Sequence, residues 1–230
     1  MNILVIGAGG VGASMASIAE TRSFFTQFVL ADISLSRAEE AIALLDDQSK
    51  FVAEQVDARD MGAIKALIQK VKADVVVNAC DPRMNEPIFN AAFEAHCNYI
   101  DMAMNLSEPH ASNPYEEVGS PLGADQLAAD QAWRDRGLLA LVGMGVEPGL
   151  SDVFARYAAD NLFDTIDEIG VRDGSNLSID GLDFAPTFSI WTTIEECLNP
   201  PIVWERNRGL YTTDCFSEPE VFHFPAGIGP

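Results

Sequence analysis

Apolar runs of strand length alternate with segments of helical periodicity along most of the chain. The predicted strands occupy residues 2–6, 28–32, 51–57, 74–79, 98–104 and 138–144. The predicted helices occupy residues 11–20, 38–47, 61–73, 86–96 and 123–137. Helices that join successive strands produce parallel sheets with right-handed crossovers. The pattern therefore predicts an α/β fold with a doubly wound parallel sheet of the Rossmann type.

The amino-acid composition changes near residues 145–150, after which Gly, Pro, Trp and Asn become frequent. We therefore expect a dinucleotide-binding Rossmann domain at residues 1–147 and an α+β substrate and dimerisation domain at residues 148–230. The second domain has one predicted helix at 150–162 and one predicted strand at 165–174. These segments are too few to close a core of their own, so we expect the second domain to be truncated.

Two local features refine this pattern. Ser36 and Glu39 have the spacing of a capping box, which predicts a helix start at that point. Residues 105–123 are rich in Pro, Ser, Asn and Gly and therefore predict a long loop. Such a loop is either an excursion near the functional site or an inert insertion.

A glycine motif directly follows the first predicted strand. Gly7, Gly9 and Gly12 have G-x-G-x-x-G spacing, which permits a tight turn, a close approach of backbone to a pyrophosphate, and close packing of helix on strand. Gly10 and Val11 lie between them at the predicted helix start, where free N–H groups and the positive end of the helix dipole favour a diphosphate. We interpret all five residues as cofactor-binding.

The ends of the second and third predicted strands each carry an acid. Asp32 lies where an acidic residue accepts hydrogen bonds from the adenosine ribose hydroxyls, and its charge would repel a 2′-phosphate, so NAD is the expected cofactor. Arg37 leaves NADP open, because its guanidinium is either solvated or paired with such a phosphate. Asp57 is either a solvated loop residue or a ligand of the adenine amino group, and we count it among the cofactor-binding candidates.

The fourth predicted strand ends in Asn78, Ala79 and Cys80, at the carboxyl edge of the sheet where ligands bind in such folds. All three are candidate cofactor-binding residues. We interpret Cys80 as an apolar lining residue rather than a nucleophile, because the sequence places no histidine beside it.

A second informative segment spans residues 143–158, where a strand end leads through glycines into a Pro-Gly turn and a helix. Glu147 stands immediately before that Pro-Gly pair. A carboxylate at this point either holds a substrate ammonium or takes its proton, since an amine gives up hydride only as the neutral species. The alternative is that Glu147 only interacts with the dipole of the following helix.

Composition narrows the class of protein. The chain has 14 Lys and Arg against 35 Asp and Glu, a formal net charge of -21, which disfavours nucleic acid and anionic membranes as partners. The four cysteines have no paired CxxC spacing and the three histidines stand apart, so no metal site is expected. No apolar run reaches the ~20 residues that span a bilayer, and the chain begins with a predicted core strand, so we expect a cytoplasmic protein.

Several stretches resemble the saccharopine dehydrogenase-like family, which includes saccharopine, lysine and carboxynorspermidine dehydrogenases. They are ILVIGAGGVG, DVVVNACDPRMNEPIFNAAFEAHCNYIDMA, GMGVEPGLSDVFARYA, FDTIDEIGVRDG, APTFSIWTTIEECLNPPIVWE and SEPEVFHFPAGIGP. The glycine motif is common to many enzymes. The element with an acid before Pro-Gly and the two last stretches are more particular to this family.

The resemblance implies a Rossmann domain followed by a substrate domain with a mixed sheet. It also implies pyridine-nucleotide-dependent chemistry at a C–N bond, commonly the reduction of an imine formed from an amine and a carbonyl compound. Cofactor contacts are implied at Gly7, Gly9, Gly12 and Asp32. Substrate or catalytic contacts are implied at Asp101 and Glu147. Glu147 departs from the family pattern, which commonly has aspartate before Pro-Gly, and residues 102–104 lack the tyrosine of saccharopine-forming members.

The expected function is therefore NAD(P)-dependent oxidoreduction at a CH–NH bond of an amino-acid or polyamine derivative. Asp101 and Glu147 are the catalytic candidates, NAD is the preferred cofactor, and a small amine is the substrate. An uncovered sheet edge and apolar face lead us to expect a homodimer. Two alternatives are a dinucleotide-binding module without turnover, such as a redox sensor, and a lyase or epimerase that keeps NAD bound.

Overall fold

The computed structural model describes residues 1–174, 176, 178–182, 190–217 and 219–225. Parts of the two last family-like stretches therefore lie outside the described residues. The chain divides into two compact units, Met1–Leu106 with Leu122–Asp152 and Ser107–Pro121 with Val153–Pro230. The assignment of residues 1–147 and 148–230 to cofactor and substrate binding stays a prediction.

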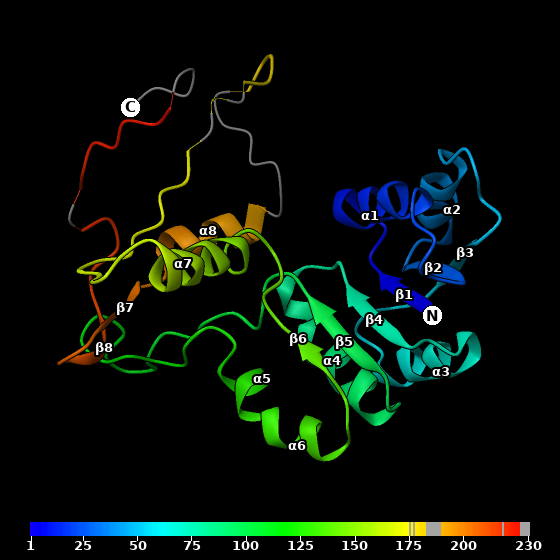
Figure 1. Ribbon diagram of the computed structural model, residues 1–230, viewed down its shortest axis with the longest axis horizontal. Coiled ribbons are helices and arrows are strands. Elements are labelled where there is room, and N and C mark those ends of the chain that lie inside the picture. Colours follow the sequence, from blue (N-terminus) through cyan, green and yellow to red (C-terminus); the bar gives the residue numbers. More distant parts are fainter. Residues whose placement is uncertain (175, 177, 183–189, 218, 226–230) are drawn as a thin grey trace. The chain divides into compact units, whose positions relative to one another are not determined.

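A six-stranded parallel sheet forms the centre of the first unit, with the strand order β3-β2-β1-β4-β5-β6 (Figure 1). Its strands are β1 Asn2–Ile6, β2 Gln27–Asp32, β3 Phe51–Gln55, β4 Val75–Asn78, β5 Asn98–Asp101 and β6 Ala140–Leu141. The order reverses between β1 and β4, which is the switch point of a Rossmann sheet. The predicted fold class is confirmed.

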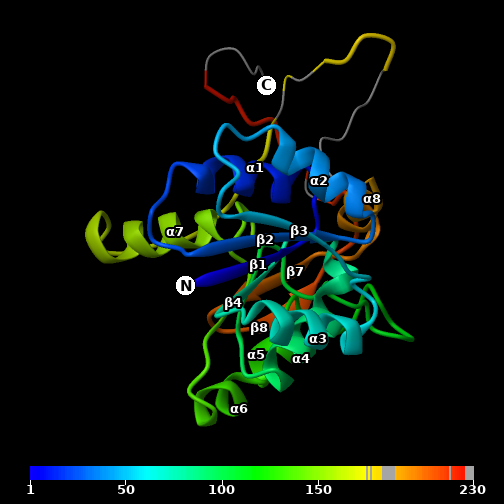
Figure 2. The ribbon, with the colours of Figure 1, turned by 90° about the vertical axis from the view of Figure 1, so that its right-hand side faces the viewer.

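Helices cover both faces of this sheet, with α1 and α2 on one face and α3 and α4 on the other (Figure 2). Their bounds are α1 Gly10–Glu20, α2 Leu35–Ala43, α3 Met61–Val71, η1 Pro82–Met84, α4 Asn85–Glu94, α5 Ala124–Ala128 and α6 Asp130–Asp135. Alternate strand residues enter the two cores, so Val5 packs on the α1 and α2 side and Leu4 on the α3 and α4 side. Burial on both faces explains why the strands read as continuous apolar runs.

Some predicted boundaries were wrong. Helix α2 begins at Leu35 with Ser34 as its N-cap, so Ser36 lies inside the first turn and the predicted capping box does not form. Strand β6 is shorter than the predicted 138–144, because the chain turns at Gly143, which has φ +68°. The predicted helix at 123–137 is divided into α5 and α6.

The second unit contains most of α7 Leu150–Asn161, together with α8 Ile190–Leu198 and the antiparallel pair β7 Ile202–Glu205 and β8 Gly209–Thr212 (Figure 1). The helix predicted at 150–162 is confirmed. The strand predicted at 165–174 is wrong, because no strand pairs with that segment in the described part of the chain. The β7–β8 pair is antiparallel, so it does not by itself form the mixed sheet that the resemblance implies.

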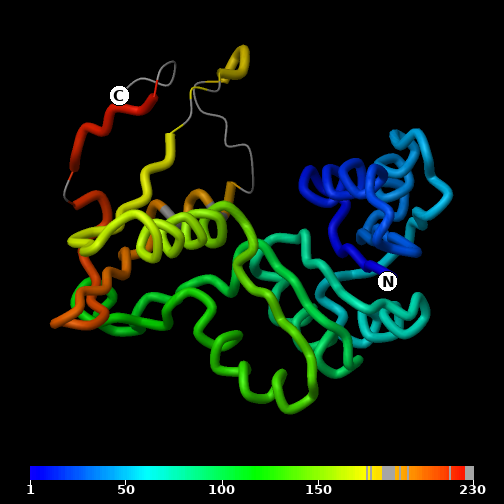
Figure 3. Tube along the Cα trace, viewed as in Figure 1, coloured from blue at the N-terminus to red at the C-terminus, as the bar shows by residue number. Residues whose placement is uncertain are grey.

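Residues 107–121 form a loop that belongs to the second unit (Figure 3). The N–H of Glu108 donates to the carbonyl of Ser120 at 3.0 Å, and the N–H of Ser120 donates back to Glu108 at 2.9 Å. Loop residues such as Glu117 line a shallow depression together with Ile202 and Thr212 of the β7–β8 pair. The loop is thus packed within its own unit. Helices in the described residues are all too short or too polar to cross a membrane.

Candidate functional site

The candidate site lies at the carboxyl edge of the sheet, where the turn after β1 meets the end of β4. The N–H of Gly7 donates to Ala31 at 2.7 Å and the N–H of Ala79 donates to Ile6 at 2.8 Å, which ties the turn to both neighbouring strands. Gly7 has φ +107°, and a Cβ at this position would lie 2.7 Å from the carbonyl oxygen of Ala79. The turn therefore requires glycine at this position.

Helix α1 begins inside the glycine motif and has no side-chain cap. Gly9 is its N-cap, and Gly9, Gly10 and Val11 are exposed. A Cβ on Gly9 or Gly10 would meet no atom within 4 Å. A Cβ on buried Gly12, in contrast, would overlap the carbonyl oxygen of Gly7, so Gly12 allows α1 to pack directly on the turn. The motif therefore combines a tightly packed base with an open rim of backbone N–H groups, the arrangement that binds a diphosphate.

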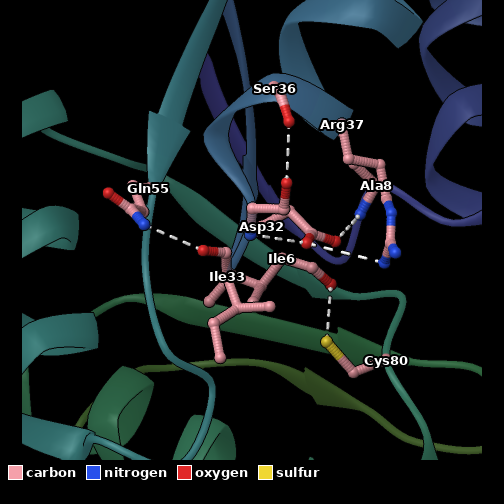
Figure 4. Close-up of polar contacts among 9 residues, drawn as sticks. Ile6, Ala8, Asp32, Ile33, Ser36, Arg37, Gln55 and Cys80 are labelled. Carbon is pink, nitrogen blue, oxygen red and sulfur yellow. Dashed lines mark hydrogen bonds and ion pairs between the residues drawn. The ribbon is translucent and has the colours of Figure 1, made fainter.

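Asp32 holds the glycine turn from the end of β2 (Figure 4). One carboxylate oxygen accepts the N–H of Ala8 at 2.9 Å and the other accepts the N–H of Ser34 at 2.9 Å. The Nη1 of Arg37 lies 3.7 Å from the second oxygen. The Asp32 side chain is only 8% exposed, whereas that of Arg37 is 61% exposed. The carboxylate is thus fixed by backbone donors, while most of the guanidinium faces solvent.

Asn78 begins a group of buried polar side chains at the end of β4. Its Nδ2 donates to Oδ1 of Asn85 at 2.6 Å and lies 3.3 Å from the hydroxyl of Tyr99, and its Oδ1 accepts the N–H of Cys80 at 2.9 Å. Burial raises the pKa of Tyr99, and the charge of Asp101 adds to this effect, so the phenol stays neutral. Nδ2 of buried Asn85 has no partner among the described residues. The hydrogen bonds that Asn78 makes nevertheless fix the direction in which the chain leaves β4.

The thiol of Cys80 points back into the sheet and donates to the carbonyl of Ile6 at 3.3 Å (Figure 4). Burial, followed by the charges of Asp32 and Asp81, raises the pKa of this thiol to about 12. A nucleophilic cysteine needs a lowered pKa. The geometry therefore favours a lining role for Cys80.

Asp57 follows β3 and forms a two-point ion pair with Arg59. The Nη2 of Arg59 lies 2.7 Å from Oδ2 of Asp57, and Nε lies 2.9 Å from Oδ1. Hydrogen bonds from Arg59 lower the pKa of the Asp57 carboxyl to about 2. An adenine ligand at Asp57 would have to share this carboxylate with Arg59, and the adenine role stays a prediction.

Asp101 ends β5 next to Asn78 in the parallel ladder. Asp101 is 1% exposed, and its carboxylate accepts hydrogen bonds from the N–H groups of Gly143 and Met104 and from the side-chain amide of Gln126, and it also interacts with the hydroxyl of Tyr99. Asp101 therefore faces the protein interior, in a different environment from Asp32.

Glu147 lies in a compact turn that follows β6 and leads into α7. The N–H of Gly145 donates to Pro148 at 3.0 Å, and the N–H of Gly149 donates to the carboxylate of Asp152 at 2.9 Å. Gly149 has φ +133°, which a residue with a side chain rarely adopts. The Glu147 side chain is exposed at the top of this turn. The turn thus presents a carboxylate at the same edge of the sheet as the glycine motif.

Residues 3–141, which span the parallel sheet, match the family model described as the saccharopine dehydrogenase NADP binding domain. The chain belongs to the saccharopine dehydrogenase family. The resemblance seen in the sequence is thereby confirmed, and a nicotinamide dinucleotide is the cofactor class of this domain. The matched segment includes the glycine motif, Asp32, Asn78 and Asp101, whereas Glu147 lies beyond it.

The names of two curated relatives refer to polyamine derivatives. Carboxynorspermidine synthase of Vibrio cholerae serotype O1 is 32% identical, over 98% of this chain and 55% of that protein. Carboxyaminopropylagmatine dehydrogenase of Synechocystis sp. is 29% identical, over 84% of this chain and 46% of that protein. This saccharopine dehydrogenase family member thus spans about half the length of the curated relatives that it matches.

A solved structure supports the fold. Saccharopine dehydrogenase (L-Glu forming) of Saccharomyces cerevisiae superposes with a TM-score of 0.52 at 15% identity, over 70% of this chain and 31% of that chain. At this level of identity the likeness concerns the fold alone.

Sequence reasoning missed the hydrogen-bond partners of the buried polar residues Asp101 and Asn78 in this family member. Gln126 binds Asp101, and Asn85 binds Asn78. The signal for Gln126 was its position seven residues before Trp133, which places both on the buried face of the α5–α6 segment. Asn85 carries no comparable signal, because it lies at the first residue of α4.

Proposed function

We propose that this saccharopine dehydrogenase family member is an NAD(P)-dependent oxidoreductase acting on a CH–NH bond of an amino-acid or polyamine derivative. The observation that carries the proposal is the open, glycine-rimmed turn at the switch point of the sheet, with the Asp32 carboxylate beside it. The polyamine names of the curated relatives support an amine substrate. The amine itself, the homodimer and the cytoplasmic location stay predictions.

The residues of the glycine turn fit a dinucleotide. The N–H groups of Gly10, Val11 and Gly12 at the start of α1 would hold the diphosphate, and Asp32 would accept hydrogen bonds from the adenosine ribose. Asn78, Ala79 and Cys80 would line the path toward the reacting end of the cofactor. When bound, a reduced nicotinamide supplies the hydride that an imine carbon accepts, while the imine nitrogen takes a proton.

In this proposal Glu147 steers the substrate nitrogen and exchanges its proton. The dipole of α7 already has one acidic partner, because Asp152 lies in the first turn and accepts the N–H of Gly149, so the helix does not depend on Glu147 for this role. Glu147 is exposed, whereas Asp101 is 1% exposed, so only the Glu147 carboxylate is accessible to a ligand from solvent. These features support Glu147, rather than Asp101, as the residue that meets the amine.

Substrate-dependent oxidation of the cofactor tests this function. The chain is incubated with NADH or NADPH, an amine such as lysine or agmatine, and a keto acid such as 2-oxoglutarate, while the absorbance of the reduced nicotinamide is followed. We expect oxidation only when both the amine and the carbonyl compound are present. Cofactor binding without turnover would instead support a dinucleotide-binding module, and a cofactor that copurifies and is never consumed would support a lyase or epimerase.

We further propose that NAD(H) is preferred over NADP(H). Two backbone N–H groups hold the Asp32 carboxylate in place, so it cannot rotate away from a 2′-phosphate. Charges of the same sign at such short range cost several kcal/mol. Arg37 offsets this repulsion only in part, since it lies 3.7 Å from the carboxylate and is mostly solvated.

Titration calorimetry with both cofactors checks the preference. We expect NADH to bind at least about tenfold more tightly than NADPH, a difference of ~1.4 kcal/mol. Arg37→Ala should leave the NADH affinity within about twofold, as should the control Arg22→Ala at an exposed arginine after α1. A tighter NADPH complex that is selectively weakened by Arg37→Ala would reverse the assignment and make Arg37 the ligand of the 2′-phosphate.

A further inference from the structure

The carboxylate of Asp101 is occupied by hydrogen bonds from within the protein. Oδ1 accepts the N–H of Gly143 at 2.7 Å and that of Met104 at 3.1 Å, and Oδ2 accepts the Nε2 of Gln126 at 2.7 Å. These partners are all donors, as is the hydroxyl of Tyr99, so the side chain acts here only as an acceptor. With 1% of its surface exposed, Asp101 has no open side from which a substrate nitrogen could approach.

The hydrogen bonds of Asp101 end on the turn that carries Glu147. In addition to the side-chain bond to Gly143, the carbonyl of Asp101 accepts the N–H of Met144 at 2.8 Å. Two successive residues at the start of the turn are therefore held by one residue of β5. Because β5 pairs with β4 on one side and with β6 on the other, this anchor is part of the sheet.

The rest of the turn packs on that anchored start. A Cβ at Gly145 would lie 2.5 Å from the carbonyl oxygen of Met102, and a Cβ at Gly149 would lie 2.7 Å from that of Gly143. Glu147 lies between these two glycines. A displacement of Gly143 would therefore be transmitted through glycine backbone contacts to the residue that carries the carboxylate.

Gln126 determines that position 101 must carry a hydrogen-bond acceptor. Its Nε2 donates to Asp101, and its Oε1 accepts the N–H of Asn105 at 2.7 Å, so the amide can take only one orientation. Gln126 is 5% exposed. Gln126 thereby links the start of the segment after β5 to the acid that holds the turn after β6. A buried amide with both ends committed specifies an acceptor, and not a donor, at position 101.

We propose that Asp101 is a positioning residue, which together with Gln126 fixes the turn of Gly143 to Gly149 and so places Glu147 toward the substrate. This inference deepens the proposed function and rests on it for the role of Glu147. It differs from the expectation that Asp101 is itself catalytic. If this assignment is correct, activity requires a hydrogen bond between the side chains at positions 101 and 126. It does not require that the carboxylate be the one at position 101.

An exchange of the two groups tests the assignment. Asp101→Asn places an amide N–H against either Gln126 or Gly143, both donors, and Gln126→Glu places two carboxylates face to face. The double substitution restores a donor facing an acceptor, with the charge moved to position 126. We expect each single variant to lower kcat/KM by at least about tenfold, and the double variant to recover to within about threefold of the unmodified chain.

The surface pair Gln131 and Asp135 provides a matched control. The Nε2 of Gln131 donates to Asp135 at 2.8 Å on the exposed face of α6, the same chemical pair outside the site. Gln131→Glu and Asp135→Asn, singly and together, should leave kcat/KM and Tm unchanged, because exposed pairs of this kind contribute little.

Hydrogen exchange measured by mass spectrometry separates positioning from chemistry. Amides in peptides spanning residues 142–152 should exchange faster in both single variants and regain protection in the double variant. Unchanged exchange in Asp101→Asn would overturn the positioning role. Restored exchange and Tm without restored kcat/KM would show that Asp101 is catalytic. If the unmodified chain turns over no amine, the proposed function fails, while the exchange data still decide whether Asp101 holds the turn.

Discussion

Gly12→Ala is expected to destabilise the fold and to abolish cofactor binding together. The new Cβ would overlap the carbonyl oxygen of Gly7, a backbone atom that the neighbouring strands hold in place. Overpacking of this kind costs up to about 3 kcal/mol. For a protein of this size that corresponds to a decrease in Tm of roughly 6–12 °C. Calorimetric unfolding and NADH titration measure the two effects.

The matched control for Gly12→Ala is Gly62→Ala in the first turn of α3. A Cβ at Gly62 would lie 3.2 Å from the Asp60 side chain, which caps the helix and can adjust. Alanine also favours the helix over glycine by up to about 1 kcal/mol. Gly62→Ala should therefore leave Tm and NADH affinity nearly unchanged. Retention of both by Gly12→Ala would show that α1 does not pack on the turn as described.

Gly9→Ala is expected to separate binding from folding. Gly9 has φ -74° and ψ -165°, an extended conformation open to alanine, and its Cβ would meet no protein atom within 4 Å. The cost to the helix N-cap is about 1 kcal/mol, so Tm should fall by no more than about 4 °C. The added methyl would instead occupy the space in which the diphosphate approaches the backbone.

The expected loss in NADH affinity for Gly9→Ala is at least about tenfold, or ~1.4 kcal/mol. Isothermal titration of the variant and of Gly62→Ala measures it against the same preparation of cofactor. An undiminished affinity would mean that the diphosphate does not lie on this turn, which would remove the main support for an oxidoreductase function.

The first unit could be predicted from the sequence because its strands are apolar on both faces and its helices have a clear period. The position of Asp32 followed from the same pattern, since an acid at a strand end next to a glycine turn has few other roles. The helix start at Ser34 was missed by two residues, because Ser34 and Ser36 are both suitable N-caps. Choosing between them requires the path of the chain after β2.

The partners of the buried acids could not be predicted in the same way. Gln126 is one polar residue in a segment with many, and its contact with Asp101 depends on where the turn after β6 places Gly143. The β7–β8 hairpin was also not predicted, for a different reason. Residues 202–205 and 209–212 are rich in β-formers and separated by three residues, so the sequence did carry a hairpin signal.

The attachment of Ala8 to Asp32 constrains how this domain can change its choice of cofactor. Replacing that acid by a small neutral residue, an obvious route toward accepting an extra phosphate, would also detach the loop that receives the diphosphate. Any gain in affinity for a 2′-phosphate on the adenosine ribose would be offset by a less rigid glycine turn at the diphosphate. A change of preference from NAD to NADP would therefore begin with substitutions at Ser36 and Arg37, and would keep the hydrogen bond between Ala8 and Asp32.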